Sequence, residues 1–568
     1  MKYLDWLDLV MFVGMLIVSA VIGIYFGYFA ADKQNTTSQY LMGGKTMGIF
    51  PVSMSLIASY ISGISILGLP SEMYVYGTQY SMIVLSEVLV SVTMAYVYLP
   101  VFYTLQITSS YEYLNKRFSS SVKILGSCIF VLKMMLYIPI VIYVPALALN
   151  QVTGVSLHLV TPAVCLICIF YTTLGGLKAV VWTDTFQIMI MMLGIVAVLI
   201  MGLVNVGGFG IVLERAAASN RLEFLNMDPD PRTRHTIWSV VFGNYFFWLA
   251  SCSANQAMVQ RCLSLPNIRK ANIAIGILAV GIIVIVGLCC FTGLIIYATY
   301  HQCDPITAKR IKKPDQILPF FVMEMAGNIP GLPGIFLSGV FSAALSTMST
   351  GLNSMTGVIF EDMIKPFCKS PVTESRASTI LKIVVVIIGV ICVAMVFVVE
   401  RLGTLIQAGK SLSGITAGPL LGMFSLGMFF PWANEKGALI GGIVSLITTA
   451  WISINSQKEI TLGNIVFPKK PVSTDGCPAD LMKNITLIDI EKIKIPSVEP
   501  FPLFEISYLW YTFTGTAVAI IVGLAISYIS GFNDPKLVDK DLITPVVQKF
   551  FYEEKKEDNN EMKSKTTS

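Results

Sequence analysis

The sequence predicts an all-α integral membrane protein with about 13 transmembrane helices. Of its 568 residues, 55% are hydrophobic and only 13% are charged, whereas about 25% of the residues in a soluble globular domain are charged. The apolar residues gather in many runs of about 18–25 residues, the length that crosses a hydrocarbon core of about 30 Å. Because backbone amides find no water in that core, each run must satisfy its own hydrogen bonds and is expected to be a helix.

The predicted spans follow one another along almost the whole chain. They cover residues 8–29, 49–70, 80–104, 122–147, 157–175, 180–204, 236–258, 272–298, 333–360, 379–400, 404–429, 436–453 and 508–530. Several are rich in Gly, Ser and Pro, which suits helices packed closely around a cavity. The first run follows Asp5 and Asp8 rather than a basic stretch, so we expect a retained helix and not a cleaved signal peptide. The charged segment from about 534 onward lacks apolar periodicity and is expected to be disordered.

Basic residues in the short loops predict the orientation of the chain. Those on one side are Lys33, Lys45, Lys116, Arg117, Lys178, Arg261, Arg269, Lys270, Lys365, Lys369, Arg376 and Lys436. The opposite short loops hold only Arg401. We therefore expect an extracellular N-terminus and a cytosolic C-terminus. The long loops 205–235, 299–332 and 454–507 also carry bases, but translocation of long loops depends less on charge.

The expected outer loops carry two further features. Asn484-Ile485-Thr486 is a sequon, so Asn484 is a candidate glycosylation site. Cys303 and Cys477 are the two cysteines in the long outer loops. They are free to form a disulfide or to remain two separate thiols, and the sequence favours neither.

Other functional classes find no support in the sequence. There is no Walker motif, no Gly-rich nucleotide loop and no serine-elbow motif, so we expect neither an enzyme nor a pump that uses ATP. His158, His235 and His301 lie far apart and have no metal-ligand spacing. The net charge is only +5, and the bases do not cluster with aromatic residues, so nucleic acid is not an expected partner.

The second span is unusually rich in small and polar residues. Ser59, Ser62, Gly63, Ser65 and Gly68 crowd its middle, and serine and glycine at this density weaken a helix. A break here would free backbone carbonyls at the depth of the membrane, where transporters use them to bind ions. The alternative is close helix packing through small residues.

The ninth span carries a polar stripe along one face. Its members are Ser338, Ser342, Ser346, Ser349, Thr350 and Asn353. Ser346 and Thr347 follow Ala343 by three and four residues, so two hydroxyls and one carbonyl can converge at one level. Sodium is a hard cation and should prefer such oxygen ligands, as calcium and magnesium do. The alternative is hydrogen bonding between helices, worth about 0.6 kcal/mol per contact.

Four ionisable residues lie inside apolar runs: Glu87, Lys133, Asp184 and Lys410. Burying such a charge costs at least about 2.5–3.5 kcal/mol, so each is a functional candidate. Lys410 could attract an anionic solute, pair with Glu87 or extend its charged end to the interface.

Several stretches resemble the sodium:solute symporter family. The most specific are YTTLGGLKAVVWTDTFQ at 171–187 and ANQAMVQRCLS at 254–264. Further matching pieces are LGLPSEMYVYG at 67–77, PALALNQVTG at 145–154, DPDPRTRHTIW at 228–238, PDQILP at 314–319 and AGPLLGMF at 417–424. The resemblance covers about residues 8–453 and is nearest to the branch of sodium-coupled monocarboxylate, multivitamin and iodide transporters.

The resemblance implies a leucine-transporter-like fold with a 5+5 inverted repeat. The expected units are a first helix and cytosolic loop (1–48), two repeats (49–204 and 205–430), two extra helices with a long extracellular loop (431–533) and a cytosolic tail (534–568). The implied sodium ligands are the carbonyls of Ala58, Ile61 and Ala343 and the hydroxyls of Ser346 and Thr347. An acid at the position of Asp184 helps sodium to pass or couple in the family, and Gln187 belongs to the same motif.

The implied substrate cavity is less sharply defined. Its candidates are Ser62, Gly63, Glu87, Gln256, Gln260, Gln407 and Lys410. The sugar branch has bulky aromatic residues where this chain has Ser251 and Cys252, which disfavours a sugar gated in the same way. Gln407, however, stands where that branch has a sugar-contacting glutamine.

The expected function is sodium-coupled import of a small organic anion, a monocarboxylate or vitamin-type carboxylate, by alternating access at the plasma membrane. Sodium is the coupling ion, and no other cofactor is expected. Iodide, a sugar or another neutral solute is the alternative cargo. A sodium-dependent solute sensor or channel without coupled transport is the alternative of a different class. The oligomeric state is left open.

Overall fold

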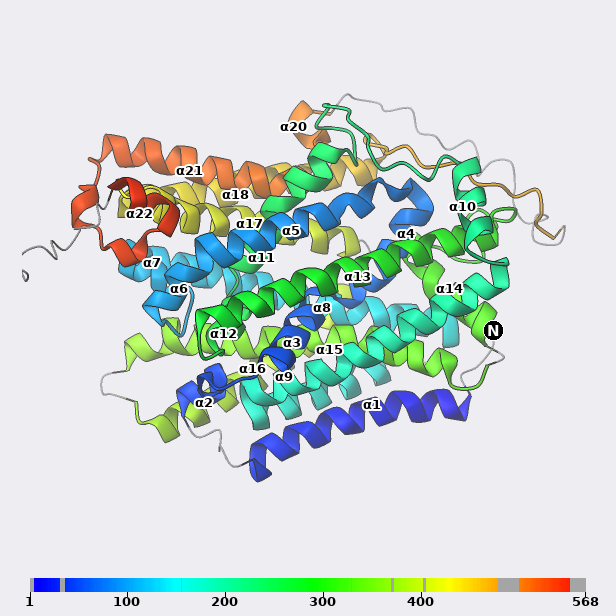
Figure 1. Ribbon diagram of the computed structural model, residues 1–568, viewed down its shortest axis with the longest axis horizontal. Helices are drawn as coiled ribbons and strands as arrows, with labels where there is room; N and C mark the ends of the chain where they lie inside the picture. The colour runs from blue at the N-terminus through cyan, green and yellow to red at the C-terminus, as the bar shows by residue number, and fades with distance from the viewer. Residues whose placement is uncertain are drawn as a thin grey trace, which may run out of the picture.

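Long helices run side by side through the whole molecule (Figure 1). The computed structural model describes residues 5–30, 36–154, 156–327, 329–368, 372–401, 405–478 and 500–551, with the side chains of 148, 151–153 and 399–412 left out. Within these ranges there are helices, turns and loops but no strand. The expected all-α membrane fold is confirmed.

The helices fall into long spans and shorter segments. The first half of the chain forms α1 (Trp6–Ile24), α2 (Thr37–Met42), α3 (Ile49–Tyr60), α4 (Gly63–Tyr76), α5 (Ile83–Thr93), α6 (Leu99–Leu105), α7 (Glu112–Arg117), α8 (Ser120–Thr153), α9 (Leu157–Val206), α10 (Phe209–Ala218), α11 (Asn244–Ser253) and α12 (Gln256–Leu263). The second half forms α13 (Ile268–Tyr300), α14 (Ile317–Ala326), α15 (Leu332–Val358), α16 (Glu374–Arg401), α17 (Leu405–Phe429), α18 (Glu435–Leu462), α20 (Pro502–Glu505), α21 (Tyr511–Ile529) and α22 (Pro545–Phe551).

Nine helices of the described chain are long and apolar enough to cross a membrane, or ten if a pair bent by 110° counts as one span. The predicted spans 157–175 and 180–204 both fall within α9, which is interrupted at Gly176 with φ 51°. A Cβ atom at Gly176 would lie 2.7 Å from the Tyr40 carbonyl oxygen, so this close approach requires glycine. The predicted second and seventh spans correspond to interrupted helices, the eleventh corresponds to α17, and the count of thirteen stays a prediction.

The two ends of the bundle carry different segments. Figure 1 shows the N-terminus beside α10 and α14 at one end, and α2, α6, α7, α12 and α22 at the other. The described chain thus begins and ends on opposite sides, as an odd number of crossings requires. A disulfide joins Cys303, after α13, to Cys477, after α18. The sequon residue Asn484 lies outside the described residues.

Helix α15 forms the centre of the bundle. Every residue from Phe336 to Val358 is buried. Helices α1, α3, α8 and α9 all pack against α15. Small residues make this packing close, since a Cβ atom at Gly339 would lie 3.2 Å from the Met191 backbone. The polar stripe of α15 therefore faces protein rather than lipid, which explains why a membrane helix tolerates so many hydroxyl groups.

Candidate functional site

The second span is broken in the middle, as its composition predicts. Helix α3 ends at Tyr60 and α4 begins at Gly63, with Ile61 and Ser62 in extended conformations. The Ile61 amide still donates to the Ile57 carbonyl at 3.1 Å. The next carbonyl, that of Ala58, would need the amide of Ser62, which has left the helix. The break thus turns backbone oxygen atoms toward the centre of the bundle, where an ion can replace the missing donors.

The polar part of α15 lies directly beside this break. A Cβ atom at Gly63 would lie 3.4 Å from the Val340 carbonyl oxygen, and the Ser59 and Thr350 hydroxyls are 2.9 Å apart. Between these two contacts, the Thr347 hydroxyl donates to the Ala343 carbonyl at 3.0 Å. The Ser346 hydroxyl is buried, lies near the Asp184 carboxylate and makes no close hydrogen bond in the described part of the chain. A buried hydroxyl oxygen without a close protein partner has lone pairs available to a cation.

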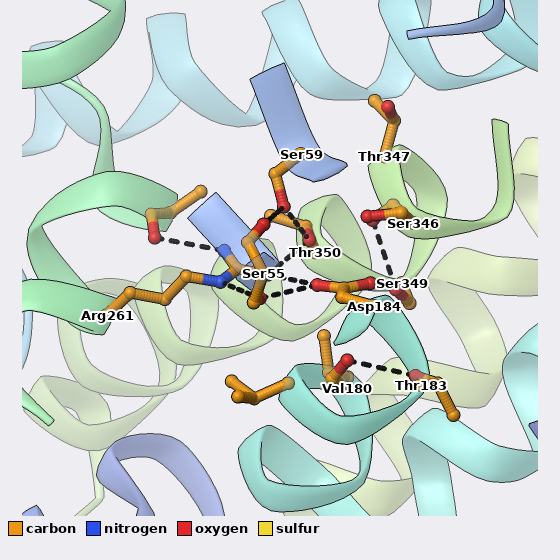
Figure 2. A network of polar contacts seen from close by, with 12 residues as sticks. Ser55, Ser59, Val180, Thr183, Asp184, Arg261, Ser346, Thr347, Ser349 and Thr350 are labelled. Carbon is orange, nitrogen blue, oxygen red and sulfur yellow. Dashed lines mark hydrogen bonds and ion pairs between the residues drawn. The ribbon is translucent and has the colours of Figure 1, made fainter. Parts of the chain in front are cut away.

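Next to these hydroxyls lies a buried ion pair (Figure 2). The Asp184 Oδ2 atom accepts a hydrogen bond from the Ser55 hydroxyl at 2.6 Å and one from Arg261 Nη2 at 3.1 Å. Arg261 Nε donates to Ser55 Oγ at 2.7 Å, and Arg261 Nη2 also contacts the Thr350 hydroxyl. Asp184 Oδ1 is buried with no hydrogen-bond partner among the described residues. Figure 2 shows Ser346 and Ser349 beside this carboxylate, so the open oxygen belongs to the same polar cluster as the α15 hydroxyls.

A second helix break faces the same region. Helix α11 ends at Ser253 and α12 begins at Gln256, with Asn255 in an extended conformation. The Asn255 side chain accepts a hydrogen bond from the Ala257 amide at 3.0 Å and so caps α12. This break places Arg261 on α12 inside the bundle, opposite Asp184.

A cavity of about 220 Å³ lies between the two breaks. Ser62, Asn255 and Thr347 line it, together with Lys133 of α8 and Trp248 of α11. Drug-sized ligand sites usually measure about 300–1,000 Å³, so this space suits a smaller solute. Trp248 stacks on Tyr60, with ring centroids 5.0 Å apart and planes 21° apart, which gives the cavity one flat aromatic wall.

Some predicted cavity residues lie elsewhere. Gln256 accepts from the Ser110 amide at 2.6 Å and donates to the Thr108 carbonyl at 2.7 Å, so its amide holds the loop before α7 and does not line the cavity. Gln260 likewise donates to the Leu41 carbonyl. These contacts correct the expectation that both glutamines face the solute.

The remaining candidates divide in the same way. Of the described candidates, Ser62 lines the cavity, whereas Gly63 and Glu87 do not. Gly63 packs against Pro145 of α8, where a Cβ atom would clash at 2.7 Å. Glu87 is buried on α5, with Oε1 unpaired among the described residues. The side chains of Gln407 and Lys410 lie outside the described residues. Gln187 donates to the Ser19 hydroxyl at 3.5 Å, away from the cavity.

Sequence reasoning missed three residues at the site. It assigned Arg261 to a cytosolic loop, but the side chain is only 2% exposed and is paired with Asp184. Trp248 and its partner Tyr60 also went unrecognised, because the argument about aromatic residues considered only Ser251 and Cys252. An arginine within the motif ANQAMVQRCLS was the available signal for the first.

The chain matches known proteins along almost its whole length. The model of the sodium:solute symporter family matches residues 40–445. The human sodium-coupled monocarboxylate transporter 1 is 39% identical over 547 residues, covering 94% of this chain and 89% of that protein. The rabbit sodium-dependent multivitamin transporter is 37% identical over 547 residues, covering 95% and 85%. A solved sodium-coupled sialic acid symporter in a substrate-bound, outward-open state superposes with a TM-score of 0.74 at 23% identity, covering 94% of this chain and 99% of that one.

Proposed function

Because the chain belongs to the sodium:solute symporter family, we propose that it imports a small monocarboxylate together with sodium by alternating access. It is a multi-pass membrane transporter, and sodium is its coupling ion. One observation carries the proposal: the break between α3 and α4 lies against the hydroxyl groups of α15. A small cavity lies beside this contact, and the described residues that line it include no Asp or Glu. Relatives named for monocarboxylates and for vitamins support an organic anion as the cargo.

In this proposal, sodium binds between α3 and α15. Its ligands are the carbonyls of Ala58, Ile61 and Ala343 and the hydroxyls of Ser346 and Thr347. The buried Ser346 hydroxyl without a close protein partner supports this assignment, as does the loss of helical conformation directly after α3. An ion held there ties two helices together and can therefore favour one conformation of the transporter.

In this proposal, Asp184 takes part in the passage or coupling of sodium. Its open oxygen belongs to the carboxylate that lies beside Ser346 and Ser349 (Figure 2). We assign it to the passage or coupling of sodium, with Arg261 holding its other oxygen in place. Gln187, one turn further along α9, supports this part of the helix.

The direction of transport follows from charge and sidedness. The N-terminus is proposed to be extracellular and the C-terminus cytosolic, in the plasma membrane. Basic residues of α7, at one end of the bundle, support this orientation. One anion carried with more than one sodium moves net charge, and each charge gains about 2.3 kcal/mol per 100 mV. The proposed repeats are 49–204 and 205–430, and each contains one of the two broken helices.

Radiolabelled uptake tests the proposal. Cells expressing the protein should accumulate lactate, pyruvate or nicotinate in sodium buffer but not in choline buffer. The Ser346→Ala/Thr347→Ala variant should lose this uptake at normal surface expression. Ser338→Ala is the matched control, because its hydroxyl bonds only within α15, to the Gly334 carbonyl at 2.7 Å. That variant should behave as wild type.

Other outcomes of the uptake assay would support a different cargo, a different class of protein or a different sodium site. Sodium-dependent accumulation of iodide or of a neutral solute, with no uptake of carboxylates, would replace the cargo but keep the symporter. Sodium current without accumulation of any solute would support a sensor or channel. Uptake unaffected by the double substitution would remove the sodium site from α15.

A further inference from the structure

Lys133 is a buried cation in the wall of the cavity. Its side chain is 7% exposed and lies on α8, roughly 20 Å along the helix from Ser120 and roughly 30 Å from Thr153 at about 1.5 Å per residue. A lysine stem is too short to carry its charge to either surface from there. Met134 and Tyr137, next to it and one turn further along α8, line the same cavity, so Lys133 belongs to the face of α8 that borders it.

No acidic group of the described chain neutralises Lys133. The Lys133 ammonium makes no hydrogen bond or ion pair with any described residue. The described residues that line the cavity include no Asp or Glu. Arg261, the other cation of the lining, is already paired with Asp184. Glu87 does not line the cavity. The described wall therefore carries an unmatched positive charge, which is costly in a low-dielectric interior unless a ligand supplies the counter-charge.

Two further donors of the same wall have no acceptor. Asn244 Nδ2 and Trp248 Nε1 are buried without a hydrogen-bond partner in the described part of the chain, and both residues line the cavity. A tryptophan N–H can only donate. Both N–H groups are closed off from the cavity in this conformation. Because an unmet buried donor costs about 1–3 kcal/mol, a small rotation of either side chain toward an acceptor bound in the cavity would be favourable.

We propose that Lys133 binds the carboxylate of the transported acid, with the N–H groups of Asn244 and Trp248 as additional donors. The inference rests on the proposed function and deepens it, since it assigns the charge that selects an anion. A carboxylate meets both requirements of this wall, because it is a negative charge and offers about four acceptor sites. An amide or an alcohol of similar shape would leave the ammonium unmatched.

This position also links the anion to sodium. Thr347, a proposed sodium ligand, lines the same cavity as Lys133. In an empty cavity the ammonium repels an incoming sodium ion, and a bound carboxylate removes this repulsion. Each ligand then strengthens the binding of the other by the same factor.

The test compares wild type, Lys133→Arg and Lys133→Gln at equal surface expression. The probes are nicotinate uptake and its inhibition by nicotinamide, which has the same ring without the negative charge. K133Q should raise the KM for nicotinate about tenfold to a hundredfold, and K133R should stay within a few-fold of wild type. Inhibition by nicotinamide should change less than about twofold, because it makes no use of the charge. Saturating nicotinate should lower the half-saturating sodium concentration in wild type and do so less in K133Q.

Wild-type KM in K133Q, with sodium-dependent uptake intact, would overturn this inference alone. Absence of sodium-dependent nicotinate and lactate uptake by wild type would overturn the proposed function and this inference with it. If K133Q does not reach the surface, Asn244→Asp gives the second test. Its new carboxylate should repel the substrate and compete for Lys133, raising the KM at least tenfold, and an unchanged KM would count against the assignment.

Discussion

Replacing Asp184 by Asn removes the carboxylate that pairs with Arg261 at the centre of the bundle. The two side chains are 0% and 2% exposed, and loss of one partner of a buried pair costs about 3–5 kcal/mol because the other charge is left uncompensated. At about 2.1 cal/mol/K per residue, the 568 residues have an unfolding entropy of about 1.2 kcal/mol/K. Purified Asp184→Asn should therefore unfold about 3–4 °C below wild type in a thermal-shift assay.

A variant that removes both charges separates stability from transport. Asp184→Asn/Arg261→Gln should recover most of the lost stability, since no unpaired charge remains. It should still fail to accumulate substrate in sodium buffer, because the negative charge of Asp184 is gone. Asp184→Asn with the unfolding temperature of wild type would refute the reasoning. The reasoning would also be refuted if the loss of stability in the double variant equalled the sum of the losses in the two single variants. The two side chains would then have no interaction energy with each other.

Three smaller perturbations probe other parts of the site. Trp248→Phe keeps an aromatic wall but removes the indole N–H, so the KM for nicotinate should rise about two- to tenfold in uptake assays. A membrane-impermeant maleimide should label Cys303 and Cys477 on intact cells only after reduction, because the two form a disulfide. The exposed Cys368 should react only in permeabilised cells if its loop is cytosolic. Gln256→Ala should lower the unfolding temperature, through loss of its two backbone hydrogen bonds, while the KM for nicotinate stays within about twofold of wild type.

The break in the second span could be predicted because its cause is local. Ser59, Ser62, Gly63 and Ser65 lie close together in the sequence, and each weakens the helix without help from the rest of the fold. The second break, after Ser253, has no such signal, because the segment around it contains neither glycine nor proline. Tertiary contacts stabilise it instead, notably those of Gln256 with the loop before α7.

Arg261 shows why charges near the ends of apolar runs are hard to assign. It follows a predicted span and was counted with the loop bases, yet α12 returns it to the interior, where Asp184 lies 77 positions away in sequence. Such a pairing depends on how two helices fold against each other and leaves no trace in local composition. The same limit applies to Lys133, whose position inside an apolar run marked it as a candidate without indicating that it faces the cavity.

Helix α3 connects the parts of the site, and this explains how they can act together. Ser55 on α3 holds Asp184 and Arg261, whereas the end of the same helix supplies the proposed sodium ligands. Ser62, directly after the break, lines the cavity. A shift of α3 against α15 would therefore alter the ion pair, the sodium site and the substrate site at once. If the shift is favourable only when sodium and the anion are both bound or both absent, the two must cross together, which is the condition that coupled transport requires.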